Sequence, residues 1–249
     1  MLKKLTSIFI SSAFLLILIS HVKAQRFSNK EIFLKTIDYK LDLKVDYKSE
    51  KIFANCQLTV LNPSEQSIWQ IPLTLYRLMK VTSVENEEEA DLSFTQQVTS
   101  YEDWEKLQVN YIEISLKNPI QRGAKKTIRI KYEGYLLGYS EVGMKYVKDR
   151  VDEKFTIIRP DCKAYPEVGY PSWKVSRSAG LQSYNYLINV TVPNSLAVAN
   201  GGKLVQKISK YLTSARFGQA GAFLKLQIIC NNLKLGGMHE NREKVQDFA

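Results

Sequence analysis

The sequence predicts an all-β fold: an antiparallel β sandwich or bent, saddle-like sheet, preceded by a helical signal peptide. Three observations support this. Several long runs alternate apolar with polar residues, and short turn signals rich in Asn, Pro and Gly separate them. No comparably long run repeats with the 3.6-residue period of a helix. We therefore expect many strands joined by short turns, and not an alternation of strands and helices.

The clearest expected strand covers residues 36–47, where apolar and charged residues alternate without exception. This pattern is typical of a strand with one face toward the core and the other toward water. Its apolar residues are Ile37, Tyr39, Leu41, Leu43, Val45 and Tyr47, and its charged residues are Asp38, Lys40, Asp42, Lys44 and Asp46. We expect Tyr39, Leu41 and Leu43 to face the interior, and Asp42 and Lys44 to face solvent.

One long domain accounts for most of the chain. The same alternation recurs near residues 128–132 and 184–192, and turn signals such as Asn62-Pro63 and Arg122-Gly123 lie between the runs. These runs predict a single β domain over residues 27–211. Residues 212–249 carry no clear pattern. They are interpreted as a C-terminal tail whose secondary structure is poorly assigned from the sequence.

The N-terminus has the features of an export signal. Lys3 and Lys4 precede an apolar run, and Val22-Lys23-Ala24 places short side chains where a signal peptidase cleaves. The alternative is an uncleaved anchor helix, but four serines interrupt the run and make it marginal for a membrane span. We expect cleavage of residues 1–24, a mature chain that begins at Gln25, no stable membrane span after cleavage, and a periplasmic or secreted location.

The charge of the chain does not indicate a nucleic-acid partner. The formal net charge is +10, and loss of three lysines with the signal peptide leaves +7. The remaining Lys and Arg residues are scattered along the expected strands and form no basic block. Solvated strand faces account for this charge better than a polyanionic partner does.

Three cysteines, Cys56, Cys162 and Cys230, are spaced too widely for a zinc knuckle or a redox pair. Cys56 lies on the apolar face of an expected strand and is interpreted as a small buried hydrophobe. Cys162 and Cys230 can pair in an oxidising compartment, but spacing does not select that bond, and both alternatives stay open.

Residues 157–176, "IIRPDCKAYPEVGYPSWKVS", form a stretch that we call the Pro-aromatic segment. Its prolines deny backbone donors to a sheet, so an ordered loop is expected. Loops that are rich in aromatic residues and fixed by proline are suited to binding. The candidate binding surface consists of Arg159, Tyr165, Glu167, Tyr170 and Trp173. The alternative is that these rings simply close one end of the sandwich.

A second distinctive stretch, residues 83–94, is rich in carboxylates: "SVENEEEADLSF". Clustered carboxylates can hold calcium, but the alternating Asp pattern and glycine bend of a calcium loop are missing. A solvated loop is the preferred interpretation.

The stretch "YNYLINVTVPNSLAVANGGKLV" resembles the strand pair that ends the N-terminal domain of the gluzincin aminopeptidases, zinc metallopeptidases such as aminopeptidase N. The matching features are Val192-Pro193, Leu196-Ala197-Val198 and Asn200-Gly201. Upstream, "YKLDLKVDYKSEKIFANCQLTVLNPSEQ" resembles the opening hairpin of that family, and "KKTIRIKYEGYL" its strand before the substrate-side loop. The resemblance covers about Ile37 to Lys207 and implies a saddle-shaped β domain.

The chain departs from that family at the motif Phe-Pro-Cys-x-Asp-Glu-Pro. Here the corresponding residues run from Tyr165 to Pro171, and only the aromatic residue and the two flanking prolines match. In the family, a Gln or Glu shortly before this motif helps to hold the amino terminus of the substrate. No residue matches it, and Glu167 is a candidate by its location alone.

The catalytic motifs of the family are missing from this sequence. Zinc binding there needs a His-Glu-x-x-His helix and a later Glu, because two imidazoles four residues apart lie on one helix face. The sequence contains His21, inside the expected signal peptide, and His239. The family's Gly-x-Met-Glu-Asn motif is also absent. So is the Gly-x-Ser-x-Gly elbow of hydrolases that use a Ser-His-Asp triad. We therefore expect no catalytic residue, metal ligand or cofactor, with zinc present only in a full-length relative.

Two functions remain at this point. The first is a non-catalytic exported β domain, from a truncated or partial metallopeptidase-like protein, whose partner is a missing catalytic domain or a peptide. The alternative is a stand-alone exported module that binds a peptide, a glycan or a partner protein through the Pro-aromatic segment.

Overall fold

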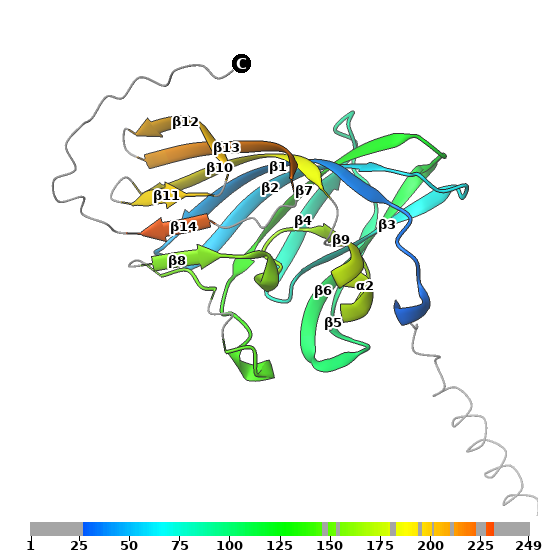
Figure 1. Cartoon of the computed structure of the whole chain (residues 1–249), viewed down its shortest axis with the longest axis horizontal. Helices are drawn as coiled ribbons and strands as arrows, with labels where there is room; N and C mark the ends of the chain where they lie inside the picture. The colour runs from blue at the N-terminus through cyan, green and yellow to red at the C-terminus, as the bar shows by residue number, and fades with distance from the viewer. Residues whose placement is uncertain are drawn as a thin grey trace, which may run out of the picture.

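The computed structural model describes residues 27–145, 149–152, 155–179, 183–193, 196–200, 202–209, 212–222 and 228–231. The expected signal peptide lies outside these residues. Within them, the strands form sheets of seven, three and four strands, accompanied by one seven-residue helix (Figure 1). The predicted all-β, mostly antiparallel fold is confirmed.

The largest sheet has seven strands among the described residues, in the order β12-β13-β10-β1-β2-β7-β4. Its strands are β1 (Lys35–Asp46), β2 (Lys51–Leu61), β4 (Met79–Glu85), β7 (Lys125–Tyr135), β10 (Tyr184–Pro193), β12 (Lys203–Ser209) and β13 (Leu212–Ala222).

Two smaller sheets complete the described fold, in the orders β5-β6-β3-β9 and β11-β14-β8. Their strands are β3 (Ile68–Tyr76), β5 (Phe94–Tyr101), β6 (Trp104–Ile120), β9 (Glu167–Val168), β8 (Phe155–Ile158), β11 (Ala197–Ala199) and β14 (Ile228–Asn231). The short elements outside the sheets are η1 (Phe27–Asn29), η2 (Ser140–Val142), η3 (Pro160–Cys162) and α2 (Trp173–Ala179).

One central strand pair is parallel. Residues 38–44 of β1 lie beside residues 185–191 of β10 and run in the same direction, while β1 pairs with β2 in antiparallel fashion. The seven-stranded sheet is therefore mixed. An alternating pattern reveals which face of a strand is buried but not the direction of its neighbour, so the sequence did not predict this pairing.

Strands continue beyond the expected domain boundary at residue 211. Strand β13 pairs with β10 from Leu212 to Ala222, and β14 pairs with both β8 and β11. Part of the expected tail therefore belongs to the sheets. The apolar alternation that marks β1 is weak in β13, whose sequence "LTSARFGQAGA" is rich in Ala and Gly. A strand is therefore hard to predict from these residues.

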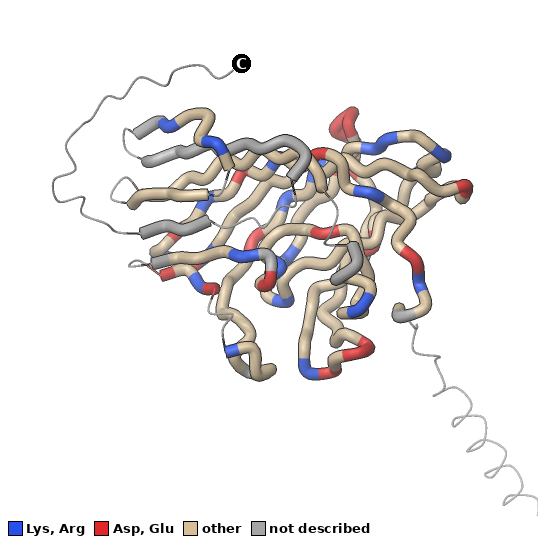
Figure 2. The backbone as a smooth tube through the Cα atoms, viewed as in Figure 1, with Lys and Arg blue, Asp and Glu red and all other residues tan. Residues whose placement is uncertain are grey.

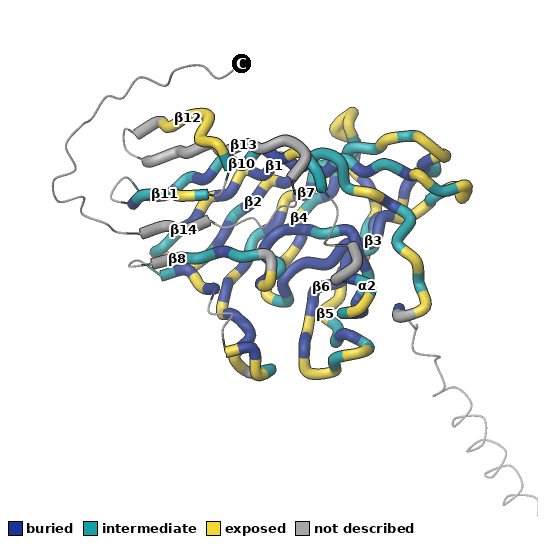
Figure 3. Tube along the Cα trace, viewed as in Figure 1, coloured by how far each residue is buried: buried dark blue, intermediate teal, exposed yellow. Residues whose placement is uncertain are grey.

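The core lies between the sheets, on the inner face of the seven-stranded sheet (Figure 3). Tyr39, Leu41, Leu43 and Val45 of β1 are each at most 3% exposed, whereas Asp42 and Lys44 are exposed. Both predicted faces of this strand are confirmed. Cys56 on the neighbouring strand is fully buried, as expected of a small hydrophobe.

Gly134 allows the turn between β3 and β4 to approach β7. A Cβ atom at this position would lie 2.1 Å from the carbonyl oxygen of Leu78 and 2.7 Å from Cα of Met79. A side chain here would therefore displace the backbone that begins β4. The close approach explains why a glycine occupies the interior of a strand.

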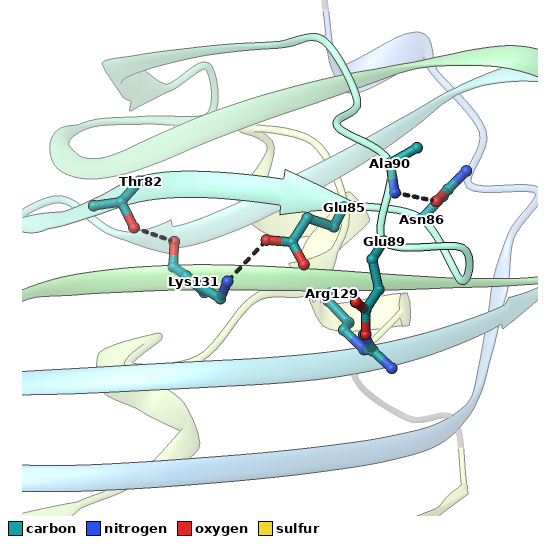
Figure 4. A network of polar contacts seen from close by, with 7 residues as sticks. All are labelled: Thr82, Glu85, Asn86, Glu89, Ala90, Arg129 and Lys131. Carbon is teal, nitrogen blue, oxygen red and sulfur yellow. Dashed lines mark hydrogen bonds and ion pairs between the residues drawn. The ribbon is translucent and has the colours of Figure 1, made fainter.

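The acidic loop is anchored to strand β7 (Figure 4). Nζ of Lys131 lies 2.8 Å from Oε1 of Glu85, and Nη1 of Arg129 lies 2.6 Å from Oε1 of Glu89. The hydrogen bond from Lys131 lowers the pKa of the Glu85 carboxyl. In addition, the backbone N–H of Thr127 donates to Glu87 at 3.0 Å. The loop is exposed, as expected, but its carboxylates hold it against the strand.

The burial pattern of β1 generates a stability prediction. Leu41→Asp places an unpaired charge in the core and is expected to lower the free energy of unfolding by about 3–5 kcal/mol, whereas Lys44→Asp on the outer face costs less than about 0.5 kcal/mol. Urea denaturation followed by circular dichroism measures both changes. Equal tolerance at the two positions would mean that the strand faces are assigned wrongly.

Candidate functional site

The Pro-aromatic segment is built from several short elements and is not a single loop. It contains the end of β8, then η3, then β9, and finally the first turn of α2. Pro160, Pro166 and Pro171 stand between or at the starts of these elements, and because proline cannot donate a backbone hydrogen bond, each interrupts regular pairing. The expected ordered loop is therefore corrected to a chain of short elements that enters the core.

Arg159 is held by a buried carboxylate. Asp149 is fully buried, and its Oδ1 accepts hydrogen bonds from Nε of Arg159 at 3.0 Å and from Nη2 at 2.6 Å. The backbone N–H of Arg159 also donates to Oδ2 of Asp149 at 2.5 Å. These hydrogen bonds raise the pKa of the guanidinium. The Arg159 side chain is therefore engaged within the protein and not presented to a ligand.

Tyr165 lies inside the core. It is 2% exposed, and its ring meets that of Tyr39 edge-on with centroids 5.8 Å apart. Next to it, the hydroxyl of Tyr132 donates to the carbonyl of Ala164 at 3.0 Å. The segment thus contacts β1 and β7 of the seven-stranded sheet from within, and Tyr165 contributes packing between elements.

Glu167 forms an ion pair with Lys163, four residues earlier in the chain. The side chain of Lys163 is 12% exposed and that of Glu167 is 23% exposed. Burial acts to lower the pKa of Lys163, but the neighbouring Glu167 carboxylate outweighs it, and the net shift is upward. Because Lys163 already neutralises this carboxylate, Glu167 does not offer a free negative charge to a substrate amine.

Tyr170 and Trp173 lie at the four-stranded sheet, where the N-terminal residues and α2 pack. The ring of Tyr170 stacks on Phe27 with centroids 6.0 Å apart, and Nζ of Lys30 lies 4.9 Å from its centroid. Trp173 meets Trp104 edge-on at 5.3 Å. These contacts fix both rings against other parts of the chain.

The start of α2 is set by Asp103, from the turn between β5 and β6. Its carboxylate accepts hydrogen bonds from the backbone N–H groups of Trp173 at 2.6 Å and Lys174 at 2.8 Å. Burial acts to raise the pKa of Asp103, but these N–H groups dominate and lower it. A carboxylate from a turn that is distant in the sequence therefore orients the end of the Pro-aromatic segment.

The five candidate residues fall into two places. Arg159 and Tyr165 lie where the segment enters the core. Glu167 belongs to β9 of the four-stranded sheet, against which Tyr170 and Trp173 also pack. Each of the five has a contact within the chain, so the geometry gives the segment a packing role. This favours the interpretation that the rings close the end of the sandwich.

The described residues contain no assembled metal centre. The thiol of Cys162 is free and buried, it donates to the carbonyl of Arg159 at 2.9 Å, and burial raises its pKa well above the usual range. Cys162 is therefore a small buried core residue here and not a disulfide partner. No group of three or more His, Cys, Asp or Glu side chains within the described part of the chain is placed to hold a metal ion. His21 and His239 lie outside that part.

Three residues of this region escaped sequence reasoning: Asp149, Lys163 and Asp103. Lys163 stands four residues before Glu167, which is a visible signal, but outside a helix that spacing does not predict contact. Asp149 and Asp103 lie 10 and 70 residues from their partners Arg159 and Trp173. Only the fold brings those pairs together.

Among the residues that the structure describes, no helix has the length and hydropathy needed to cross a membrane.

Comparisons with solved structures identify proteins with a similar fold. No family model and no curated protein matches the sequence. Among solved structures, an M1 zinc metallopeptidase from Deinococcus radiodurans, a mutant bound to the substrate Tyr-Ser-Ala, matches with a TM-score of 0.58 at 17% identity. A two-domain M1 zinc metallopeptidase bound to L-tryptophan matches with a TM-score of 0.59 at 16% identity. The chain has the fold of one part of the M1 zinc metallopeptidases.

The match includes most of this chain but less than half of each metallopeptidase. It covers 80% of this chain in both cases, but only 42% and 43% of the two metallopeptidases. The chain thus spans less than half the length of the structures that it resembles. The predicted structural likeness to a single domain of a zinc metallopeptidase family is confirmed.

The Lys163–Glu167 pair generates a prediction about this region. Glu167→Ala leaves a largely buried ammonium group without its partner and is expected to lower the free energy of unfolding by about 2–3 kcal/mol, while the double variant Lys163→Met, Glu167→Ala recovers most of that loss. Urea denaturation of the single and double variants measures the coupling.

The matched control is Glu65→Ala, which removes one partner of an ion pair whose side chains are 66% and 75% exposed. Its expected cost is less than about 1 kcal/mol. Strictly additive effects of the two changes at Lys163 and Glu167 would contradict the assignment of a structural ion pair.

Proposed function

We propose that this chain is a non-catalytic, exported β domain of an aminopeptidase-like zinc metallopeptidase, and that its partner is a peptidase catalytic domain. The observation that carries the proposal is the extent of the structural match: 80% of this chain against 42–43% of two metallopeptidases, one of which is described as having two domains. A chain of this size corresponds to one such unit.

The residues of the chain support the absence of intrinsic peptidase chemistry. A zinc site of the His-Glu-x-x-His type needs two histidines on one helix, and the sequence has two histidines in all, at positions 21 and 239. They are more than 200 residues apart. Export through the signal peptide expected at residues 1–24 would remove His21.

An apolar surface at the end of β7 supports a protein partner. Leu78, Tyr135 and Leu137 are 37%, 43% and 62% exposed. Leu78 and Tyr135 are adjacent, because the N–H of Tyr135 donates to the carbonyl of Leu78 at 3.4 Å. Neighbouring exposed apolar side chains of this kind favour contact with another protein surface.

The proposal predicts that the purified chain contains no stoichiometric zinc and does not release amino acids from aminoacyl reporter substrates. Elemental analysis after equilibration with zinc, together with an aminoacyl-p-nitroanilide assay, measures both properties. The control is His239→Ala, since trace activity from a contaminating peptidase would be unchanged by it. Zinc near one equivalent, with chelator-sensitive turnover that His239→Ala abolishes, would overturn the proposal.

A further inference from the structure

The outer face of the seven-stranded sheet, opposite the core, carries a groove of about 360 Å³. It crosses the centre of the sheet, and its lining includes Asp42, Lys44, Phe53, Asn55, Lys131 and Glu133. These residues come from β1, β2 and β7, away from the Pro-aromatic segment. The groove is therefore separate from the site considered above.

The strand register orders these side chains into two neighbouring rows. One row runs from Lys44 on β1 to Phe53 on β2 and Glu133 on β7. The other runs from Asp42 to Asn55 and Lys131 on the same three strands. Directly opposed side chains on one face of a sheet lie about 4.5–5.5 Å apart at Cβ. The rows thus form one continuous surface with the Phe53 ring in its middle.

Contacts within the chain hold several of these groups in place. Oδ1 of Asp42 lies 3.2 Å from Nδ2 of Asn189, which donates to it. Lys131 is fixed by Glu85, as Figure 4 shows, and Glu133 lies 3.1 Å from Nζ of Lys51. Side chains that are already ordered lose little conformational entropy when a ligand binds. Asp42, Lys131 and Glu133 are therefore held in place before a ligand binds.

The charges of the groove favour a neutral ligand over a strongly charged one. Its lining contains two lysines, Lys44 and Lys131, and two carboxylates, Asp42 and Glu133, so the formal charges cancel. Figure 2 shows the same interspersion of Lys and Arg with Asp and Glu over the strands of the molecule. A polyanion or a cation would be attracted to a surface of one sign, which this face does not offer.

The chemistry of the groove fits a carbohydrate. The half-buried Phe53 ring offers an apolar face, Asn55 offers both a donor and an acceptor, and Asp42 and Glu133 offer acceptors. A pyranose ring has an apolar C–H face and hydroxyl groups that both donate and accept hydrogen bonds around its rim. The volume lies within the range of about 300–1,000 Å³ that small-molecule sites occupy.

We propose that this groove binds a neutral oligosaccharide, with a sugar ring stacked on Phe53 and its hydroxyls hydrogen-bonded to Asn55 and Asp42. An extended peptide fits less well, because β1, β2 and β7 each have neighbouring strands on both sides and their backbone groups are already paired. The groove would make the chain a carbohydrate-binding module in addition to its proposed place beside a peptidase domain.

The test is calorimetric titration of the full mature chain with three neutral probes, cellohexaose, chitohexaose and maltohexaose, and with hexagalacturonate as the charged control. At least one neutral probe is expected to bind with a Kd of about 1 mM or below, equivalent to about −4 kcal/mol. Because no net charge is involved, the affinity should change less than about twofold between low and high salt. Binding of hexagalacturonate alone, or of no probe, would overturn the proposal.

Variants locate the binding surface. Phe53→Ala should weaken binding about tenfold or more, and Asn55→Ala severalfold, because they remove the stacking face and a hydrogen-bonding amide. Two controls should stay within about twofold of the unmodified chain. Gln57→Ala alters the same face of β2 outside the groove, and Trp69→Ala removes a ring that is 56% exposed on β3.

Phe53→Leu keeps the proposal testable if Phe53→Ala does not fold. It retains most of the apolar volume but lacks a flat ring, so it should fold with a urea midpoint near that of the unmodified chain and still lose affinity. Binding that survives both Phe53→Leu and Asn55→Ala, or that Trp69→Ala weakens equally, would contradict the groove as the site. None of these outcomes bears on zinc content or peptidase activity, so the two proposals fail independently.

Discussion

The parallel pairing of β1 with β10 is the contact on which the rest of the structure depends. It places residues 185–191, from late in the chain, beside residues 38–44 at its start. Of the strands between them in sequence, β2, β7 and β4 continue the same sheet on the other side of β1. Tyr39 of β1 meets Tyr165 of the Pro-aromatic segment edge-on, so the segment packs on the sheet that the pairing completes. Burial of these rings and of the alternating apolar faces supplies the main stabilising free energy.

The two faces of the seven-stranded sheet differ in chemistry because buried and exposed residues alternate along its strands. The inner face is apolar and covered, while the outer face carries ordered rows of charged and amide side chains around Phe53. The part that resembles the M1 metallopeptidases is the strand framework, and the proposed carbohydrate groove depends on the outward side chains of that framework. One fold can therefore support a domain role in a peptidase and a separate binding surface.

The features of the fold that depend on local periodicity could be predicted from the sequence. The faces of β1 and the burial of Cys56 followed from alternation, and the likeness to a zinc metallopeptidase domain followed from the order of strand and turn patterns. Contacts between residues that are distant in the sequence could not be predicted from periodicity. Examples are Asp149 with Arg159 and Asp103 with α2. The groove at Phe53 likewise depends on which strands lie beside β2. The short elements at Pro160, Pro166 and Pro171 are difficult to predict because each has only a few residues and prolines at these positions also favour a loop.

Disulfide trapping across β1 and β10 tests the central pairing most directly. In the parallel register Asp42 faces Asn189 and Lys40 faces Leu187, all on the outer face of the sheet. Cysteine pairs at 42 with 189 and at 40 with 187 should therefore oxidise readily without loss of stability, because directly opposed positions have the separation that a disulfide needs. The pair at 40 with 189 should oxidise slowly. Fast oxidation of 40 with 189, and little of the other two, would contradict the parallel pairing.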